Sequence, residues 1–201
     1  MLRRGLSVSR TLKRDKKLVF APADAVRKLM EIANRQGKPF YTLVSEILEQ
    51  ALEAHSVGVS LKELLESYSY VRTHSACGIA LVPREVIVES ISKLNSSEKE
   101  RFDKEWRKLG EKYGQYASAR FKDPLKFFEG LLRKGGLWDL NEVSIEENEG
   151  VVRVRCVCPV LSVKETDILL NFVDGVMRAC NYRSAKHDVM KGIVALEYTK
   201  T

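Results

Sequence analysis

The sequence predicts an α+β protein, in which an N-terminal pair of helices precedes a larger domain with an antiparallel sheet. Apolar residues recur with a helical period of about 3.6 residues through the first two thirds of the chain, and the period changes to about two in the last third. A length of 201 residues with 44% hydrophobic content is enough for one large or two modest domains with a proper core. No internal repeat is visible.

The first pair of helices is predicted within residues 16–57. A short extended run, Leu18 to Ala21, precedes Pro22, and two amphipathic helices follow, with Gly37 between them. Pro22 suits the first turn of a helix, and Gly37 followed by Pro39 marks a helix end with a new start close behind. The two apolar stripes consist of Val26, Leu29, Met30, Ile32 and Ala33, then Leu43, Val44, Ile47, Leu48, Ala51 and Leu52. So short a unit cannot bury both stripes alone, and we therefore expect it to dimerise.

This order of elements resembles the ribbon-helix-helix DNA-binding family. The resemblance covers about the first quarter of the chain and includes the helix end Ile32-Ala33-Asn34-Arg35-Gln36-Gly37 and the pairs Leu43-Val44 and Ile47-Leu48. It implies that two chains pair their strands into an antiparallel ribbon in the DNA major groove, while the start of the second helix approaches a phosphate. The residues that it implies are Lys16, Leu18 and Phe20 toward the groove, Val19 and Ala21 toward the core, and Lys38, Phe40 and Tyr41 at the second helix.

Two features of this segment favour an alternative interpretation. Leu18 and Phe20 offer only apolar contact, whereas a base-reading strand usually carries side chains that hydrogen-bond to base edges. The second helix begins Lys38-Pro39-Phe40-Tyr41-Thr42, without the usual Ser or Thr cap near the phosphate. The alternative is an interaction or assembly protein in which this unit only pairs two chains.

The positive charge is concentrated in a basic arm, residues 1–15. The chain has a formal net charge of +7, and its first seventeen residues contain seven Lys and Arg side chains against Asp15 alone. Such an arm is typical of salt-sensitive phosphate contact, for which we expect Arg10, Lys13, Arg14 and Lys17, although a solvated tail has the same composition. The expected partner is double-stranded DNA.

The remaining chain is predicted to comprise a linker helix, residues 58–72, and an α+β ligand-sensing or dimerisation domain, residues 73–201. Ser60 and Glu63 form a capping-box pattern at the start of the linker helix. The domain is predicted to contain a strand at 73–82, helices at 83–94, 98–121 and 124–132, a hairpin across 140–158, a helix at 164–180 and a terminal strand at 189–198. Gly110 and Gly114 share one face of the long helix, where they allow close approach of a neighbouring helix.

The part from Val82 to Tyr198 looks like a small-ligand-binding domain of the 4-vinyl-reductase type. The similarity rests on the segment Trp106 to Gly114, on the Gly-Gly-Leu-Trp turn at 135–138 and on a helix with Phe172, Gly175 and Met177. It implies a cavity for a small apolar ligand, whose candidate lining residues are Trp106, Tyr113, Phe128, Trp138 and Phe172. The alternative is that these aromatic residues form an ordinary core. The family's closing pair of cysteines around a glycine is absent, because Asp188 and Leu196 flank Gly192, and no metal site is therefore implied.

Catalysis has little support in the sequence. It contains no glycine-rich phosphate loop, nucleophile elbow or HExxH motif, and its three histidines are isolated. Cys156 and Cys158 share one face of a strand, where core packing is favoured over a metal or redox site. Four scattered cysteines, no apolar run long enough to span a membrane and no signal-peptide core predict a cytoplasmic location. We expect a DNA-binding transcriptional regulator without a cofactor, active as a homodimer or higher homo-oligomer, and not an enzyme.

Overall fold

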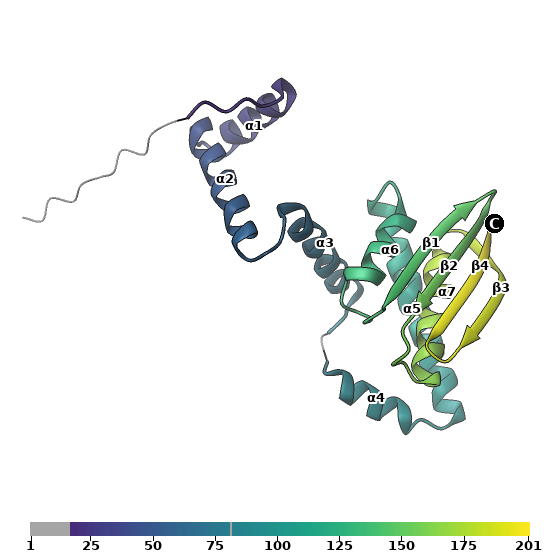
Figure 1. Cartoon of the computed structure of the whole chain (residues 1–201). Helices are drawn as coiled ribbons and strands as arrows, with labels where there is room; N and C mark the ends of the chain where they lie inside the picture. Colours follow the sequence, from purple (N-terminus) through teal and green to yellow (C-terminus); the bar gives the residue numbers. More distant parts are fainter. Residues whose placement is uncertain (1–16, 81) are drawn as a thin grey trace, which may run out of the picture. The chain divides into compact units, whose positions relative to one another are not determined.

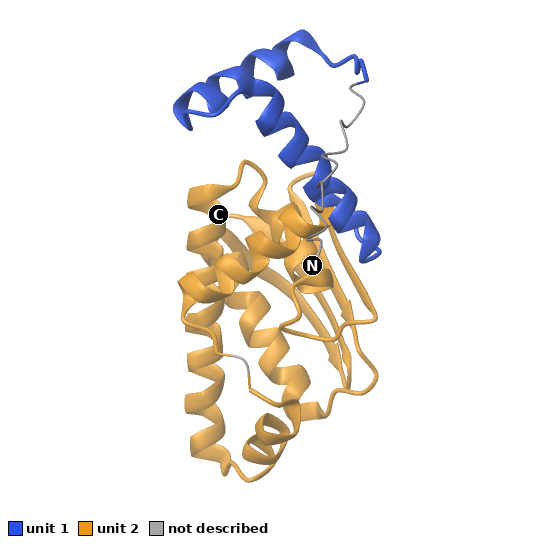
Figure 2. Cartoon of the chain, turned by 90° about the vertical axis from the view of Figure 1, so that its left-hand side faces the viewer, with its two compact units in different colours: residues 1–61 blue, residues 62–201 orange. Residues whose placement is uncertain are grey.

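The computed structural model describes residues 17–80 and 82–201 of the chain (Figure 1). Over these residues it contains seven helices and one four-stranded antiparallel sheet, which is the mixture expected of an α+β protein. The chain divides into two compact units, unit 1 with residues 1–61 and unit 2 with residues 62–201 (Figure 2). The predicted DNA contacts Arg10, Lys13 and Arg14 of the arm and Lys16 of the strand lie outside the described residues. Among the helices that the structure describes, none is long and apolar enough to cross a membrane.

Unit 1 contains a helical hairpin of α1 (Ala23–Arg35) and α2 (Phe40–Ser56), as the two apolar stripes predict. Gly37 joins the helices with a backbone φ of 64°, a left-handed conformation that glycine adopts at little cost. The amide of Lys38 donates to the carbonyl of Ala33 at 3.0 Å, and the amide of Gly37 donates to the carbonyl of Asn34 at 3.1 Å. This pair of bonds is a Schellman motif, which ends α1 and turns the chain toward α2.

The hairpin buries little of its apolar surface in a single chain. Among the described residues of unit 1, only Ala33, Leu43 and Ala54 are buried side chains. Met30, Leu48 and Leu52, all on the predicted stripes, remain exposed. Residues 17–21 precede α1 and are not part of a strand in this chain. A ribbon formed by two chains therefore stays a prediction.

The third helix corrects one prediction from the sequence. α3 spans Leu61–Cys77, so the strand expected at 73–82 is wrong over its first half. Tyr70, Thr73 and Cys77 are all buried, and their spacing of three and four residues is that of a helix face. The short segment 73–77 by itself fits the period of a strand as well as that of a helix. Its packing against the rest of unit 2 favours the helix. Gly78, with a φ of 80°, ends α3.

Unit 2 continues with four helices that begin close to their predicted starts. They are α4 (Arg84–Ser92), α5 (Ser96–Arg120), α6 (Pro124–Lys134) and α7 (Val163–Ala179). Asn95 with Glu98 and Ser162 with Glu165 form reciprocal capping boxes at the starts of α5 and α7. Asp123 caps α6, where Pro124 occupies the first turn. Side-chain oxygens therefore satisfy backbone amides at three of these four helix starts.

The sheet comprises β1 (Glu142–Asn148), β2 (Val151–Val157), β3 (Tyr182–Met190) and β4 (Ile193–Lys200), in the spatial order β1-β2-β4-β3. Glu149 and Gly150, both with positive φ, form the two-residue turn between β1 and β2. The hairpin predicted across 140–158 is present, and its turn is short because β1 continues to Asn148. The single terminal strand expected at 189–198 is two strands. β3 is an edge strand with mostly exposed residues and a shifted register between Ser184 and Lys186, which obscures its alternation.

α7 is the central element of unit 2, with the sheet on one side and α5 on the other (Figure 1). Phe172, Val173, Val176 and Met177 are all completely buried, so little of this part of α7 reaches solvent. α5 approaches α7 at backbone contact distance through glycines. A Cβ atom added to Gly114 would lie 2.6 Å from the Val176 carbonyl oxygen, and glycines at 110 and 175 leave even less room. The close approach that the spacing of Gly110 and Gly114 predicts is confirmed.

Candidate functional site

The described candidates for DNA contact lie in two places in unit 1. Lys17, Leu18 and Phe20 precede α1, and Leu18 and Phe20 are 84% and 91% exposed. Lys38, Phe40 and Tyr41 lie at the start of α2, where Tyr41 is exposed and Phe40 is half-buried. No side chain caps the first turn of α2, which follows Pro39. The sequence therefore places apolar side chains on the surface at the point where the resemblance implies groove contact.

Lys38 has a carboxylate partner. Its Nζ atom lies 2.8 Å and 3.0 Å from the two carboxylate oxygens of Glu46, one turn and more along α2. This ion pair compensates the Lys38 charge within the unit. Over residues 17–61 the Lys and Arg residues equal the Asp and Glu residues in number, so the excess positive charge of unit 1 comes from residues 1–16. Electrostatic attraction to phosphates would consequently depend on the basic arm.

A second candidate site is a cavity of about 320 Å³ in unit 2. α4, α5, the start of α7 and the loops before β1 and after β2 form its walls. Its apolar lining includes the aliphatic residues Val82, Ile87, Ile91, Leu137, Val160, Leu161 and Ile168 together with Trp106 and Trp138. The volume lies at the lower end of the range of about 300–1,000 Å³ that is typical of small-molecule sites.

The structure separates the five aromatic residues predicted for a ligand pocket. Trp106 and Trp138 line the cavity, with ring centroids 5.5 Å apart. Tyr113, Phe128 and Phe172 are instead fully buried core residues that do not line it. Phe172 lies at the centre of this core group, 5.2 Å from the ring of Tyr113 and 6.0 Å from that of Phe128. Of the five predicted residues, two therefore line a cavity and three belong to the core, and ligand binding at the cavity stays a prediction.

The cavity wall that sequence reasoning missed comes mainly from α4. Ile87 and Ile91 face the cavity, and their spacing of four residues was visible in the sequence as the apolar side of that helix. The sequence did not show which element this side would face. Arg84, at the start of the same helix, donates to the Glu165 carboxylate at 2.7 Å, and the Glu165 side chain is 8% exposed. The charged residues of the lining are therefore this ion pair and Asp139.

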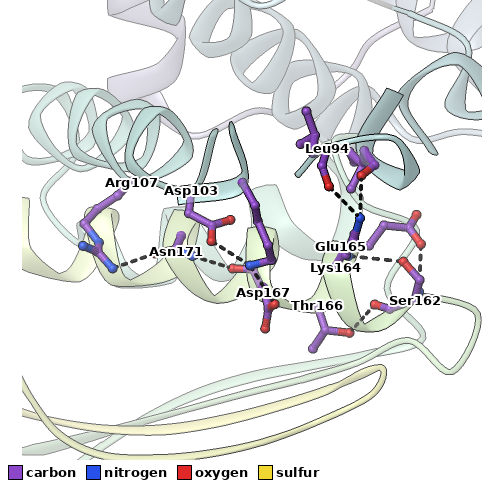
Figure 3. A network of polar contacts seen from close by, with 11 residues as sticks. Leu94, Asp103, Arg107, Ser162, Lys164, Glu165, Thr166, Asp167 and Asn171 are labelled. Carbon is purple, nitrogen blue, oxygen red and sulfur yellow. Dashed lines mark hydrogen bonds and ion pairs between the residues drawn. The ribbon is translucent and has the colours of Figure 1, made fainter. Parts of the chain in front are cut away.

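Polar contacts fix α4 and α7 to each other beside this cavity (Figure 3). The Lys164 ammonium donates to three backbone carbonyls at the end of α4, those of Ile91 at 3.1 Å, Ser92 at 3.0 Å and Leu94 at 3.3 Å. A cation at this position interacts with the carbonyls at the helix end and complements the helix dipole. Lys164 therefore holds one wall of the cavity in place.

A parallel set of contacts fixes α5 to α7 (Figure 3). Lys99 lies 2.7 Å from Asp103 and 2.9 Å from Asp167, so it bridges the two helices. Further along, Arg107 donates to the side-chain oxygen of Asn171 at 2.6 Å. Trp106 is next to Arg107 on α5, and its position at the cavity is thereby tied to α7.

Cys156 of β2 and Cys158 just after it belong to the core. Cys156 and Cys158 are 0% and 1% exposed, and burial raises the pKa of the Cys156 thiol to about 12. The Cys158 thiol donates to the backbone carbonyl of Asp139 at 2.9 Å. Among the residues that the structure describes, no group of three or more His, Cys, Asp or Glu side chains could hold a metal ion. These cysteines pack as small apolar side chains.

His74 anchors α3 to the rest of unit 2. Its Nε2 atom lies 2.7 Å from the carbonyl oxygen of Gly135, and its Nδ1 atom lies 2.6 Å from the hydroxyl of Tyr113. A carbonyl only accepts, so in the neutral ring Nε2 carries the proton and the Tyr113 hydroxyl donates to Nδ1. Burial raises the pKa of Tyr113 well above its usual range, which keeps this hydroxyl protonated.

Comparison with known proteins adds no family assignment. No protein-family model, no curated protein and no solved structure matches the chain. The resemblances to ribbon-helix-helix proteins and to 4-vinyl-reductase-type domains therefore stay predictions.

Proposed function

We propose that this protein is a DNA-binding transcriptional regulator in which unit 1 of two chains forms a ribbon-helix-helix dimer. The observation that carries the proposal is the exposure of apolar residues in a single chain, 84% for Leu18 and 91% for Phe20 immediately before α1. Met30, Leu48 and Leu52 on the helical stripes are exposed as well. A second copy that pairs strand with strand covers the helical stripes and Val19, which is 71% exposed in a single chain, and leaves Leu18 and Phe20 on the outer face of the ribbon toward DNA.

The proposed dimer binds DNA mainly through its charge. The two basic arms contact phosphates, and the ribbon brings Leu18 and Phe20 to thymine methyl groups in the major groove. Lys38 contributes little, because Glu46 already compensates its charge. Affinity therefore falls steeply with salt, and direct hydrogen-bonded base readout by the described part of the strand is weak.

A salt titration of duplex binding tests this function. The logarithm of the binding constant, measured by fluorescence anisotropy, should fall linearly with the logarithm of the salt concentration. Replacing Arg10, Lys13 and Arg14 by Ala should make the slope shallower by about 0.9 for each phosphate that the variant no longer neutralises. The matched control replaces Lys104, Lys108 and Lys112 of α5 by Ala and should leave the slope unchanged. Equal slopes for both triple variants, or no binding at low salt, would contradict the proposal.

The apolar character of Leu18 and Phe20 and the Lys38–Glu46 ion pair also favour a second candidate, an assembly protein in which unit 1 only pairs chains. This candidate shares the dimer and differs in DNA binding. A dimer by sedimentation equilibrium that does not bind duplex DNA at low salt is the result that selects it.

The cavity of unit 2 supports a ligand-sensing role for the regulator. Its lining is mostly apolar, and two of its three charged residues, Arg84 and Glu165, form an ion pair, while the third, Asp139, disfavours an anion, so the ligand class that fits is small, apolar and uncharged. Ligand binding would act on DNA affinity through the connection between the units. Such an effect requires that the two states of the dimer bind the ligand with different affinity.

Tryptophan fluorescence reports on the cavity selectively, because both tryptophans of the chain line it. Titration with toluene should change the tryptophan emission to saturation and raise the unfolding temperature. Benzoate, which has a similar size and a negative charge, is the control and should do neither. Filling the cavity with an Ile91→Phe substitution should abolish the response to toluene. An unchanged emission and unfolding temperature with toluene would refute the ligand assignment.

A further inference from the structure

α3 has two apolar faces, and unit 2 covers one of them. Tyr70, Thr73 and Cys77 are buried on this inner face, and the ring of Tyr70 lies 5.6 Å from that of Phe127 in α6. His74, with its two hydrogen bonds to Tyr113 and Gly135, lies on the same side of the helix. These contacts determine which way α3 faces within unit 2.

The opposite face of α3 carries large apolar side chains that remain exposed. This outer stripe consists of Leu61, Leu64, Leu65, Tyr68 and Val71, whose exposed fractions are between 39% and 62%. The residues recur at steps of three and four, and Leu61, Leu64, Tyr68 and Val71 follow the a and d positions of a heptad repeat. A helix surface is convex and offers no enclosed space for a small molecule. The partner that matches this spacing is another helix.

We propose that the outer stripe packs against the same stripe of a second copy, so that two α3 helices form a short parallel pair in the dimer. This inference rests on the dimer of the proposed function. Unit 1 already requires a second copy, and residues 57–60 alone separate α2 from α3. Four residues span at most about 14 Å, so dimerisation of unit 1 brings two α3 helices together at high effective concentration.

A parallel arrangement in register places like residues opposite each other. Leu61, Leu64 and Val71 meet their own counterparts, and the Tyr68 ring packs in the seam while its hydroxyl reaches the edge. Arg72, which follows Val71, places a charged side chain at the C-terminal end of the stripe. The pairing extends the dimer interface beyond unit 1 and places unit 2 of each chain on the outer side of the helix pair.

Disulfide cross-linking of the full chain tests the pairing. The variant Tyr68→Cys is made in a Cys180→Ser background, because the other three native cysteines are buried. In a parallel pair the Cα atoms of the two residues at position 68 are expected within the separation of about 4.4–6.8 Å that a disulfide requires. The matched control is Lys62→Cys on the same helix, outside the stripe and with a side chain that is 85% exposed. Mild oxidation should link Tyr68→Cys into covalent dimers at least about tenfold faster than Lys62→Cys.

Two parallel measurements separate this inference from the proposed function. Sedimentation equilibrium gives the oligomeric state, and duplex-DNA binding gives the function, for the same variants. A dimer that binds DNA but links Tyr68→Cys no faster than Lys62→Cys overturns the α3 pairing and leaves the proposed function in place. Fast linkage without DNA binding supports the pairing and contradicts the DNA-binding function. A wild-type chain that stays monomeric at micromolar concentration overturns the pairing.

A charge substitution gives an independent readout. Leu64→Glu places a carboxylate in the seam, and the same change at the exposed Ser67, outside the stripe, is the control. The first variant should raise the dimer dissociation constant at least tenfold over the second, with unchanged helix content by circular dichroism. Equal dissociation constants for the two variants overturn the pairing.

Discussion

The contact between α5 and α7 gives the sharpest stability prediction, the effect of Gly114→Ala. The added Cβ would lie 2.6 Å from the Val176 carbonyl oxygen and 2.7 Å from the Cβ atom of Ala179. Ordinary van der Waals contact at these positions is about 3.4–4 Å, so the two helices must separate by about 0.8 Å or more at this point. A methyl group has no alternative rotamer, and the atoms that it meets belong to the backbone and Cβ of α7.

The expected loss is about 2 kcal/mol in the free energy of unfolding. Overpacking of a core costs about 1–3 kcal/mol, and the upper end applies because α7 is buried between α5 and the sheet and has little room to move. Replacing glycine by alanine in a helix interior returns about 1 kcal/mol through the lower conformational entropy of the unfolded chain. The two contributions have opposite signs, and the steric term is the larger.

Urea unfolding followed by circular dichroism measures this loss. The matched control is Gln115→Ala, at the next residue of α5, whose side chain is exposed. It should change the free energy of unfolding by no more than about 0.5 kcal/mol. If Gly114→Ala proves as stable as the wild type while Gln115→Ala behaves as expected, the backbone contact between α5 and α7 is not as close as described.

Three further predictions follow from single contacts. Lys164→Ala should increase the hydrogen-exchange rate of α4 amides, because three carbonyls at the end of α4 lose the Lys164 ammonium, whereas Lys93→Ala, a change in an exposed ion pair, should not. The raised pKa of Cys156, about 12 against an ordinary value of 9.0, means that the folded state holds this proton more tightly than the unfolded state. The contribution of this thiol to stability is therefore constant below about pH 9 and declines as the pH rises toward 12. The urea midpoint of the wild type should fall over this pH range, and Cys156→Ala should make that fall smaller. Glu46→Gln should raise duplex affinity several-fold at low salt by freeing Lys38, and an unchanged affinity would argue against phosphate contact at the start of α2.

Much of the helical structure could be predicted from the sequence because local signals agree with the packing. The sequence marks the limits of α1 and the start of α2 with Pro22, Gly37 and Pro39. In the structure α1 begins after Pro22, Gly37 follows its end, and α2 begins after Pro39. The regular alternation of β2 likewise identifies its buried face, with Val154 inside and Arg153 outside. In these segments a single face is buried, so the period of the sequence carries the information.

The sequence was less informative where tertiary contacts override the local pattern. β3 lies at the edge of the sheet and exposes most residues of both faces, so it lacks the alternation that identifies a strand. The end of α3 was predicted as a strand because the short segment 73–77 fits the period of a strand as well as that of a helix, and the anchoring of His74 to Gly135 depends on residues far along the chain. Of the five aromatic residues predicted to line a cavity, only Trp106 and Trp138 do so, because periodicity shows that a side of a helix is apolar but not which element it faces.

The two-stranded ribbon between subunits is the central claim, and amide hydrogen exchange at Leu18 to Ala21 tests it most directly. In a single chain these residues belong to no strand, so their amides should exchange at the rate of an unfolded peptide. Pairing with a second chain should slow the exchange of alternate amides at least tenfold, and the protection should disappear on dilution below the dimer dissociation constant. Exchange at the unfolded rate in a sample whose mass is that of a dimer would contradict the ribbon, and with it the DNA-binding surface that it forms.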